Sequence, residues 1–172
     1  KEGGLRYLTL SAALASWNIA VTEVSAGGAM PEVLVVNRGH QPVLLIDGEE
    51  LSGAKQNRAL NTSILLKECS KTRIPVSSTE QGRRSPTSRS FQESGNVMAR
   101  TIRARKARSV SASLAESASF LSDQREVWDG IAELQSKACA PSPTSAMSDV
   151  FKAHADGLRE CAQSFPVLLN QI

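Results

Sequence analysis

Cysteine, histidine and aromatic residues are scarce in this chain of 172 residues. The three cysteines, Cys69, Cys139 and Cys161, are odd in number and form no CxxC pair, which argues against both a disulfide framework and a zinc knuckle. The two histidines, His40 and His154, are isolated in the sequence, which is typical of surface or packed histidines and not of metal ligands. We therefore expect the protein in a reducing compartment, the cytoplasm.

Long apolar runs and familiar catalytic motifs are also missing. No run approaches the ~20 residues that a membrane-spanning helix needs, and the opening "KEGGLRYLTL" contains no signal-peptide core. We therefore expect a soluble protein with no membrane partner. The GxSxG, HExxH, Walker and GxGxxG motifs are absent, and the mild net charge of +3 predicts no partner by itself. Because the chain opens on Lys1 and stops at "VLLNQI", we expect it to be a fragment of a longer protein.

Short β-branched and aliphatic runs, separated by turn residues, fill residues 5–80 and predict a β-rich half. The runs are "RYLTL", "NIAVTEV", "EVLVVN", "PVLLI", "ALNTSILL" and "TRIPVSS", and "SAALAS" is expected to interrupt them as a short helix. The turns at residues 37–39 and 47–48 predict tight hairpins, because Asn, Asp and Gly tolerate positive φ. The strands are therefore expected to be mainly antiparallel.

Helical patterns follow a polar segment. Residues 81–96 lack periodicity and predict a mobile loop, whereas residues 97–120 are rich in Ala and Arg and predict a helix. Asp123 is expected to cap a helix over residues 123–138, and a second amphipathic helix is expected over residues 148–165. The apolar stripes are Val127, Ile131, Leu134 and Ala138 in the first of these helices, and Phe151, Ala155, Leu158, Ala162 and Phe165, followed by the terminating Pro166, in the second.

Strands that come first and helices that come afterwards predict a single α+β domain over residues 1–172. With 41% hydrophobic residues, a chain of this length can bury a core of its own. We expect a mainly antiparallel β-sandwich or curled sheet with the C-terminal helices packed on it.

The stretch "LLIDGEELSGAKQNRALNTSILL" begins and ends as an apolar strand but carries a polar block between. If residues 53–64 form one strand, the first half of that strand is polar on both faces. Core packing does not hold such a strand, so it faces water, pairs its polar groups internally or lines a ligand site. The two faces carry Lys55, Asn57, Ala59, Asn61 and Ser63 on one side, and Gln56, Arg58, Leu60, Thr62 and Ile64 on the other.

A second polar cluster, "TEQGRR", ends the next strand, and the two clusters are predicted to converge on one site. Carboxylates there suit acid–base chemistry or a divalent cation, basic side chains suit phosphate, and amides suit a base or a sugar. The predicted catalytic residues are Glu49, Glu50, Lys55 and Glu80. The predicted ligand-binding residues are Asp47, Gln56, Asn57, Arg58, Asn61, Gln81 and Arg83.

Each part of this block also has a purely structural explanation. The dipeptide at residues 47–48 alone is typical of a hairpin turn, and Glu49 with Glu50 is typical of a solvated edge that discourages aggregation. Lys55 and Arg58 can pair with these glutamates at the surface. It is the density of polar side chains within one short span that favours a site.

The run "PVLLIDGEELSGAKQNRALNTSILL", followed by "IPVSSTEQGRR", resembles the signature of the domain family named for its association with ADP-ribosylglycohydrolases (ARG) and rhodanese-phosphatase-superfamily proteins. Weaker matches, among them "YLTLSAAL" and "SDQREVWDGIAE", extend the resemblance over most of the chain. The resemblance implies a link, by gene neighbourhood, to ADP-ribose and NAD-derived chemistry, and it implies no particular reaction. The matching motif positions are Asp47, Gly48, Glu49, Glu50, Gly53, Lys55, Gln56, Asn57, Arg58, Asn61, Glu80, Gln81, Gly82 and Arg83.

At two positions the chain departs from the family pattern, with Ser78 where many members have Cys and Arg84 where they have Trp. A thiol nucleophile at that point is therefore excluded, and stacking on that Trp is lost. The resemblance also implies further segments before and after this chain. Without them a sheet edge is left open for a second copy, which allows a homo-oligomer.

A basic segment between Arg83 and Arg108 offers a competing site. Eight basic residues stand there against one acid, Glu93, which leaves a charge of +7 locally and −4 in the rest of the chain. Such a patch suits a nucleic-acid backbone or a pyrophosphate, but only Phe91 is interleaved for stacking, so a solvated basic face is the simpler explanation. The eight are Arg83, Arg84, Arg89, Arg100, Arg103, Arg105, Lys106 and Arg108.

Three functions therefore remain open. The favoured one is an enzyme or sensor for ADP-ribose or another nucleotide, in which the predicted glutamates act as bases or cation ligands and the predicted Lys and Arg side chains hold phosphate. The alternatives are a non-catalytic nucleic-acid binder that uses residues 83–108, and a structural interaction domain whose polar block is an internally satisfied network.

Overall fold

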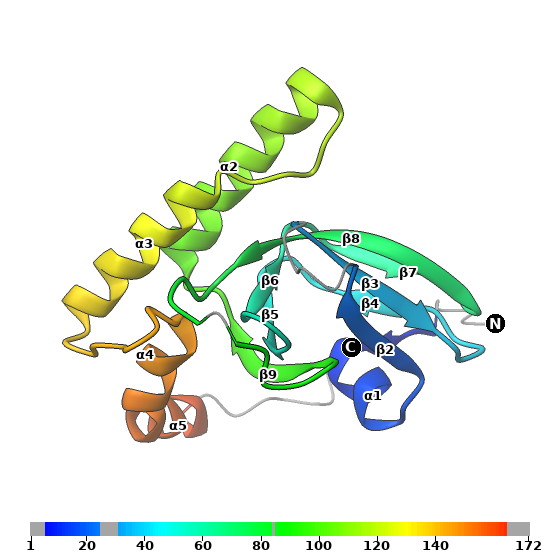
Figure 1. Ribbon diagram of the computed structural model, residues 1–172. Helices are drawn as coiled ribbons and strands as arrows, with labels where there is room; N and C mark the ends of the chain where they lie inside the picture. The colour runs from blue at the N-terminus through cyan, green and yellow to red at the C-terminus, as the bar shows by residue number, and fades with distance from the viewer. Residues whose placement is uncertain (1–5, 25–30, 84, 165–172) are drawn as a thin grey trace.

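Two β-sheets and a set of C-terminal helices make up the molecule (Figure 1). The structure is a computed structural model that describes residues 6–24, 31–83 and 85–164. The predicted features at Arg84, Phe165 and Pro166 lie outside the described residues. In chain order the elements are β1 (Leu8–Thr9), α1 (Leu10–Ala15), β2 (Ile19–Glu23), β3 (Glu32–Asn37), β4 (Val43–Leu45), β5 (Glu49–Gly53), β6 (Arg58–Leu60), β7 (Ile64–Leu66), β8 (Ser70–Ser78), β9 (Phe91–Val97), α2 (Arg100–Ser117), α3 (Gln124–Lys137), α4 (Met147–Ala153) and α5 (Ala155–Gln163).

The larger sheet has six strands in the order β2-β3-β8-β6-β5-β9, and its neighbouring strands are antiparallel. It curls so far that its two edges approach each other, because Thr22 of β2 forms a bridge with Ser90 just before β9. The smaller sheet has the order β1-β4-β7, with β1 and β4 parallel and β4 and β7 antiparallel. The predicted α+β class, with a mainly antiparallel curled sheet followed by helices, is confirmed.

The chain passes repeatedly between the two sheets. Consecutive strands β3 and β4 belong to different sheets, and so do β4 and β5, β6 and β7, and β7 and β8. The turns at residues 37–39 and 47–48 therefore carry the chain from one sheet to the other, and the prediction of tight hairpins there is wrong. The residues of both turns still adopt the local conformations that their types favour. Gly39 N donates to Asn37 Oδ1 at 3.0 Å, and Gly48 has a φ of +83°.

Residues 53–64 do not form one strand, so the condition under which two polar strand faces were expected is not met. β5 ends at Gly53, residues 54–57 form a loop, β6 lies in the larger sheet, and β7 begins at Ile64 in the smaller one. Most of the polar block is therefore a hairpin loop and a turn between sheets. The polar side chains of this block therefore do not lie along one face of a sheet.

Two hydrophobic cores lie on opposite faces of the larger sheet. The first is enclosed by the curl and contains Leu60 of β6, whereas the second contains the preceding Ala59 and side chains of α2, α3 and α4. Successive residues of a strand point to opposite faces, so β6 contributes to both cores. The second core contains Ala59, Met98, Ile102, Val127, Ile131 and Met147.

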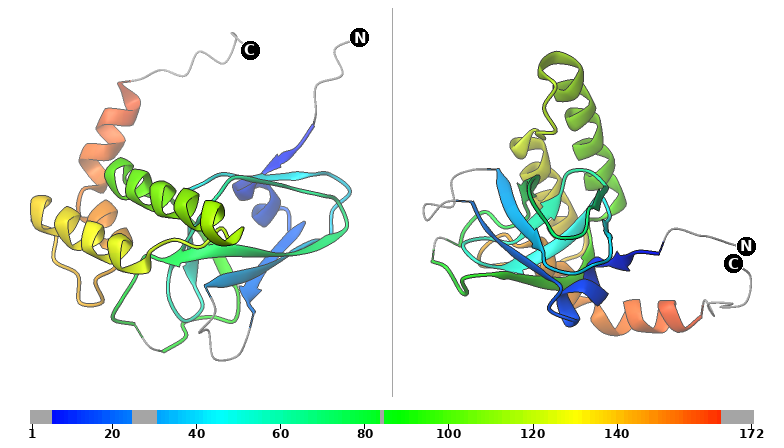
Figure 2. Two further views of the ribbon diagram at one scale, coloured as in Figure 1. Left: turned by 90° about the horizontal axis from the view of Figure 1, so that it is seen from above. Right: turned by 90° about the vertical axis from the view of Figure 1, so that its right-hand side faces the viewer.

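Helices α2 and α3 pack side by side and extend beyond the sheet, as the two views of Figure 2 show. The predicted cap of α3 is confirmed, because Asp123 accepts hydrogen bonds from the backbone N–H groups of Arg125 and Glu126. The short helix predicted at residues 11–16 is also present, as α1. No helix in the described ranges is long and apolar enough to cross a membrane.

The helix predicted over residues 148–165 is instead two helices, α4 and α5, which meet at His154. The His154 Nε2 atom lies 2.9 Å from the Ala138 carbonyl oxygen, which holds this junction to the end of α3. α5 has no buried residue, and Leu158 of its apolar stripe is 49% exposed. The prediction that this stripe packs into a core is therefore wrong for α5.

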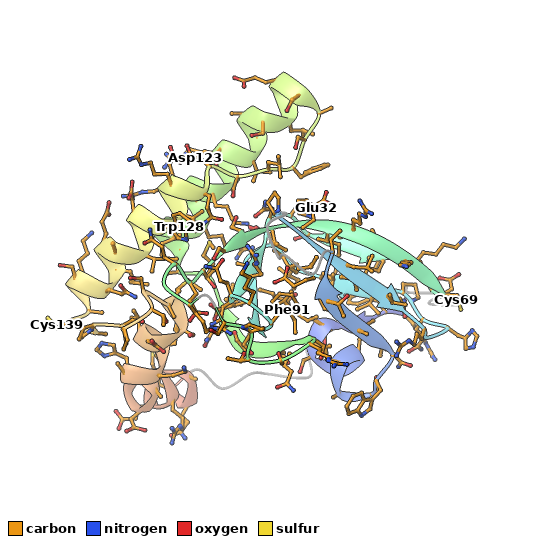
Figure 3. All side chains as sticks on the ribbon, in the orientation of Figure 1. Glu32, Cys69, Phe91, Asp123, Trp128 and Cys139 are labelled. Carbon is orange, nitrogen blue, oxygen red and sulfur yellow. The ribbon has the colours of Figure 1, made fainter. Side chains whose placement is uncertain are left out.

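The segment predicted as a mobile loop, residues 81–96, ends in β9 and so is only partly a loop. β9 is an edge strand in which Phe91 is buried and most other residues are exposed, so its sequence shows no apolar alternation. The three cysteines are free, and Cys69 and Cys139 lie at opposite ends of the molecule (Figure 3).

Candidate functional site

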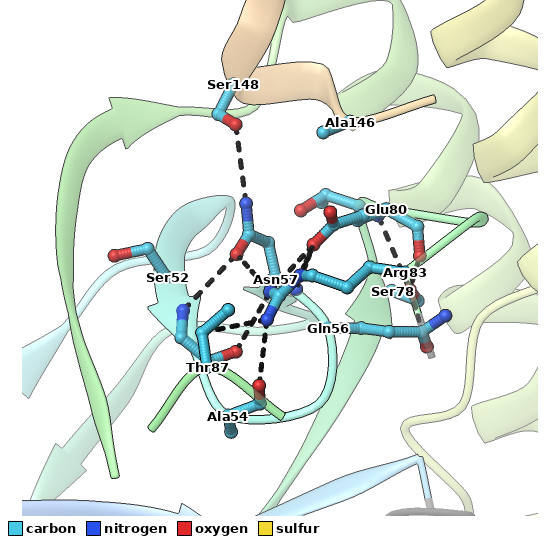
Figure 4. A network of polar contacts seen from close by, with 12 residues as sticks. Ser52, Ala54, Gln56, Asn57, Ser78, Glu80, Arg83, Thr87, Ala146 and Ser148 are labelled. Atoms are coloured by element: carbon cyan, nitrogen blue, oxygen red, sulfur yellow. Dashed lines mark hydrogen bonds and ion pairs between the residues drawn. The ribbon is translucent and has the colours of Figure 1, made fainter. Parts of the chain in front are cut away.

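Arg83 is the centre of a polar network that ties the loop at residues 54–57 to the end of β8 (Figure 4). A guanidinium group has five N–H donors, and here each of them has an acceptor. This side chain is therefore saturated within the protein. The acceptors are Glu80 Oε2 at 2.9 Å from Nε, Ala54 O and Thr87 Oγ1 at 2.9 and 2.8 Å from one terminal nitrogen, and Gly53 O and Asn57 Oδ1 at 3.2 and 3.1 Å from the other.

Glu80, which is 4% exposed, supplies the negative charge that balances Arg83. Its Oε2 atom also accepts a hydrogen bond from Asn57 N at 3.2 Å. Burial by itself raises the pKa of Glu80, but the hydrogen bonds from Arg83, Thr144 and Asn57 outweigh burial and hold the pKa below its usual range. Glu80 is therefore ionised at neutral pH and committed to Arg83.

Asn57 and Gln56 extend the network to α4 and β8. Asn57 Nδ2 donates to Ser148 Oγ at 3.3 Å, and Gln56 Nε2 donates to the Gln81 carbonyl at 3.3 Å. Gln56 Oε1 accepts from Ser78 Oγ, also at 3.3 Å. Ser78 therefore has a structural contact in this chain.

Glu50 lies behind the network and is fully buried. Its Oε1 atom accepts from Thr79 Oγ1 at 2.6 Å, and its Oε2 atom accepts from Ser94 Oγ at 3.0 Å and Asn96 Nδ2 at 3.1 Å. Burial raises the pKa of Glu50 more than these three hydrogen bonds lower it, and the nearby charge of Glu80 raises it further. The three donors are uncharged, so no cation offsets the burial of this carboxylate in these contacts.

A groove of 840 Å³ opens beside the network, between the β5–β9 pair and the helices α4 and α5. Asn57, Arg83 and Ser148 form a rigid part of its surface, and Phe151 and Leu158 supply an apolar wall. The opposite wall is rich in hydroxyl and amide side chains. These are Ser52, Ser88, Gln92, Ser94 and Asn96.

The predicted site residues fall into three groups. Asn57 and Arg83 line the groove. Glu50, Gln56, Glu80 and Gln81 belong to the hydrogen-bonded structure behind it. Asp47, Glu49, Lys55, Arg58 and Asn61 do not line it.

Asp47 belongs to a separate contact with helix α2. It forms an ion pair with Arg103 at 2.7 Å and a second one with Lys106, which is fully buried and also donates to the Leu60 carbonyl at 2.6 Å. Burial lowers the pKa of Lys106, against the opposing effect of Asp47. Asp47, the first acidic residue of the sequence "DGEE", therefore fastens α2 to the turn between β4 and β5.

Asn61 and Arg58 also have partners away from the groove. Asn61 Oδ1 accepts from Ser77 Oγ at 2.5 Å, and Asn61 Nδ2 donates to the Phe120 carbonyl at 2.9 Å. Arg58 lies 3.8 Å from the Glu23 carboxylate, and burial lowers its pKa while Glu23 raises it.

Glu49 is half-buried, and its Oε2 atom accepts from Ile46 N at 2.8 Å. Burial raises its pKa, the hydrogen bond from Ile46 lowers it, and the charge of Glu93 raises it. Lys55 is half-buried in the loop between β5 and β6. The hydrogen bond of Glu49 to Ile46 lies outside the network around Arg83. The predicted catalytic roles of Glu49 and Lys55 stay predictions.

Sequence reasoning missed the residues that β9 and α4 contribute to the groove. Ser94, Asn96, Ser148 and Phe151 all line it. The polar segment "ESGN" carries one signal, since a glycine inside a strand often marks a bulge. Nothing in the sequence places that segment opposite β5.

Four of the eight basic residues between positions 83 and 108 form ion pairs within the part of the chain that the structure describes. Arg105 forms a bidentate ion pair with Glu133, in which its two terminal nitrogens donate to the carboxylate oxygens at 2.8 and 2.9 Å. The other paired cations are Arg83 with Glu80, and Arg103 and Lys106 with Asp47. These pairs reduce the charge that the segment offers to a nucleic acid.

A family model for the ARG and Rhodanese-Phosphatase-superfamily-associated Protein domain, ARPP-1, matches residues 1–172. The chain belongs to this family. No curated protein and no solved structure matches it. In this ARPP-1 domain, Arg83 and Glu80 at the end of β8 fasten the loop at residues 54–57. The match names neither a ligand nor a reaction, so the functional roles of the motif residues stay predictions.

Proposed function

We propose that the groove beside the Arg83 network binds a small nucleotide-like ligand such as ADP-ribose. Its volume of 840 Å³ lies within the range of about 300–1,000 Å³ that is usual for small-molecule sites. The observation that carries the proposal is the pairing of a wall of hydroxyls and amides with an apolar wall that contains an aromatic ring. Ribosyl hydroxyls suit the first wall, and a base suits the second.

The charges of the groove favour an uncharged ribosyl part inside and phosphates at the rim. Arg83 has no donor left for a phosphate. Lys152 also lines the groove, and its side chain is 74% exposed and paired with Asp149 at 3.0 Å. Because such an exposed pair is weak, Lys152 can exchange Asp149 for a phosphate oxygen at little cost.

Binding is better supported than turnover. Glu80 is committed to Arg83, and Glu50 has no exposed surface, so neither carboxylate is placed to take a proton from a ligand. Among the residues that the structure describes, no group of three or more His, Cys, Asp or Glu side chains is arranged to hold a metal ion. We therefore propose an ADP-ribose sensor, while catalysis and a divalent cation stay predictions.

Isothermal titration of the whole chain with ADP-ribose tests the proposal. Phe151→Ala removes the ring and is expected to weaken binding about 5-fold or more, since stacking of a base contributes about 1–3 kcal/mol. Lys152→Ala is expected to weaken binding a few-fold, by about 1 kcal/mol or less. Lys71→Ala, an exposed lysine on β8 away from the groove, is the matched control and is expected to bind normally. Absence of binding, or an equal loss in all three variants, contradicts the proposal.

A short RNA distinguishes the competing nucleic-acid function. If residues 83–108 bind RNA, affinity falls steeply with salt, because each neutralised phosphate releases about one counterion. Arg103 and Arg105 are already engaged with Asp47 and Glu133, so we expect weak RNA binding. Tight, salt-sensitive RNA binding that survives Phe151→Ala and Lys152→Ala would overturn the ADP-ribose proposal in favour of a nucleic-acid binder.

A further inference from the structure

Strand β9 contains a bulge at the point where it passes Glu50. In the pairing of β5 with β9, Glu49 lies opposite Val97 and Leu51 lies opposite Glu93, so residues 94–96 stand opposite the single residue Glu50. A regular antiparallel pair places one residue opposite one, and such irregularities often re-aim side chains next to binding sites. Gly95 at the centre of the bulge has a φ of +75°, and a Cβ there would meet nothing within 4 Å.

Glu50 is the group that fixes the shape of this bulge. Ser94 Oγ and Asn96 Nδ2 both donate to Glu50 Oε2, at 3.0 and 3.1 Å, and Asn96 N donates to Ser94 Oγ at 3.0 Å. Ser94 and Asn96 also line the groove. The carboxylate therefore holds, from behind, two polar side chains that a ligand in the groove would meet.

We propose that Glu50 is a positioning residue for the groove, and that its ionised form holds Ser94 and Asn96 in the orientation that binds the ligand. This inference rests on the proposed function for its ligand, but the ordering of the bulge by Glu50 can be measured without one. Glu50 touches no ligand itself, because it is fully buried.

The hydrogen-bonding capacities of the partners explain why ionisation matters. An ionised carboxylate only accepts hydrogen bonds, and the amide nitrogen of Asn96 only donates them. A proton on Oε2 would point at the donors of Ser94 and Asn96, and a proton on Oε1 would require the hydroxyl of Thr79 to reverse its role. Protonation of Glu50 therefore removes or rearranges the contacts that shape the bulge.

Burial and one neighbouring charge both raise the pKa of Glu50. The neighbouring charge is the carboxylate of Glu80, which follows the end of β8 at Ser78. Thr79, on the same segment, contributes an uncharged hydroxyl. On β9, Glu93 is exposed, and on α4 Asp149 and Lys152 pair with each other. A raised pKa means that Glu50 loses its charge at a higher pH than an exposed glutamate does, and ligand affinity is expected to fall as the pH drops through that pKa.

The test measures the dissociation constant of ADP-ribose as a function of pH for the wild-type chain and for Glu50→Gln. Glutamine is uncharged like protonated glutamate, and its amide has to point donors either at Ser94 and Asn96 or at Thr79 Oγ1, so Glu50→Gln is expected to bind at every pH as the acidified wild-type chain does. We expect wild-type affinity to fall about 10-fold or more on acidification and the affinity of Glu50→Gln to change little. Glu116→Gln, which changes an exposed carboxyl on α2 that does not line the groove, is the control and is expected to keep the wild-type profile. A wild-type pH profile in Glu50→Gln overturns the proposal.

A ligand-free readout separates this inference from the proposed function. In ¹H–¹⁵N spectra, the side-chain amide of Asn96 and the backbone amide of Gly95 are expected to shift with one pH midpoint in the wild-type chain, and that midpoint is expected to vanish in Glu50→Gln. If ADP-ribose fails to bind but the midpoint is present, the ligand proposal fails while the ordering of the bulge by Glu50 stands. If the Asn96 signals ignore pH, or keep the midpoint in Glu50→Gln, the positioning role is refuted.

Discussion

Replacing Arg83 by methionine removes the cation that balances Glu80 inside the network. Methionine retains an apolar stem of similar length, so the change tests the guanidinium and not the packing. The variant leaves Glu80 4% exposed and without its ion pair, and it also removes the donors that reach the Gly53 and Ala54 carbonyls. We therefore expect Arg83→Met to be strongly destabilised at neutral pH.

The size of the effect follows from the burial of the pair. Removing one partner of a buried ion pair costs about 3–5 kcal/mol, because the other charge stays buried and unbalanced. The Arg83 side chain is 16% exposed, so water reaches part of this site and the lower end of that range applies, about 3 kcal/mol. In a domain of this size, that loss corresponds to a decrease of roughly 6–12 °C in melting temperature.

The loss should depend on pH. In the wild-type chain the pKa of Glu80 lies below its usual value of 4.5, so its contribution to stability is fully present above that value and is lost as the pH falls through the folded pKa. In Arg83→Met, burial is no longer outweighed and the pKa of Glu80 rises. Protonated Glu80 needs no cation, so the deficit of the variant is expected to shrink on acidification.

Urea unfolding curves at neutral pH and near the usual pKa of a glutamate measure both effects. Arg159→Met is the matched control, because Arg159 pairs with Asp156 at 3.2 Å on the exposed face of α5, and it is expected to change stability by less than about 0.5 kcal/mol. A loss below about 1 kcal/mol in Arg83→Met, or a loss that is the same at both pH values, would refute the assignment of Glu80 and Arg83 as a buried pair.

Three further predictions concern other parts of the fold. Lys106→Met is expected to lower the free energy of unfolding in urea by about 3 kcal/mol, because it leaves Asp47 without its buried partner. Arg103→Met is expected to lower it by about 1 kcal/mol or less, because the Arg103 side chain is 39% exposed. Equal losses in the two variants would contradict this difference. Gly53→Ala is expected to destabilise the domain by more than about 1 kcal/mol, because Gly53 has a φ of +112° and a Cβ would lie 2.7 Å from Ser88 Oγ. Gly157→Ala, with open space around it in α5, is expected to stabilise that helix by about 0.5–1 kcal/mol, measured as helical signal in circular dichroism, and no increase would contradict this expectation.

Local sequence patterns predicted the parts of the fold that depend on residues close together in the chain. The cap of α3 at Asp123 needs only Arg125 and Glu126, and the apolar stripe with Val127 and Ile131 needs only helical spacing. The strands of residues 5–80 were likewise visible as short apolar runs. The cap and the stripe form from groups within a few residues of one another, and a strand is marked by its local apolar pattern, although its pairing with other strands is not.

Tertiary structure alone decided which polar residues meet. Asp47 stands two residues before Glu49 in the sequence, yet its side chain pairs with Arg103 and Lys106 on α2. The adjacent motif residue Glu50 is directed to Ser94 and Asn96 on β9. Both outcomes depend on how the chain passes between the two sheets and on the bulge of β9, because these bring residues more than forty positions apart into contact. A turn signal such as the one at residues 47–48 fixes the local backbone but not the strand that comes to lie beside it, so only packing decided which polar side chains meet.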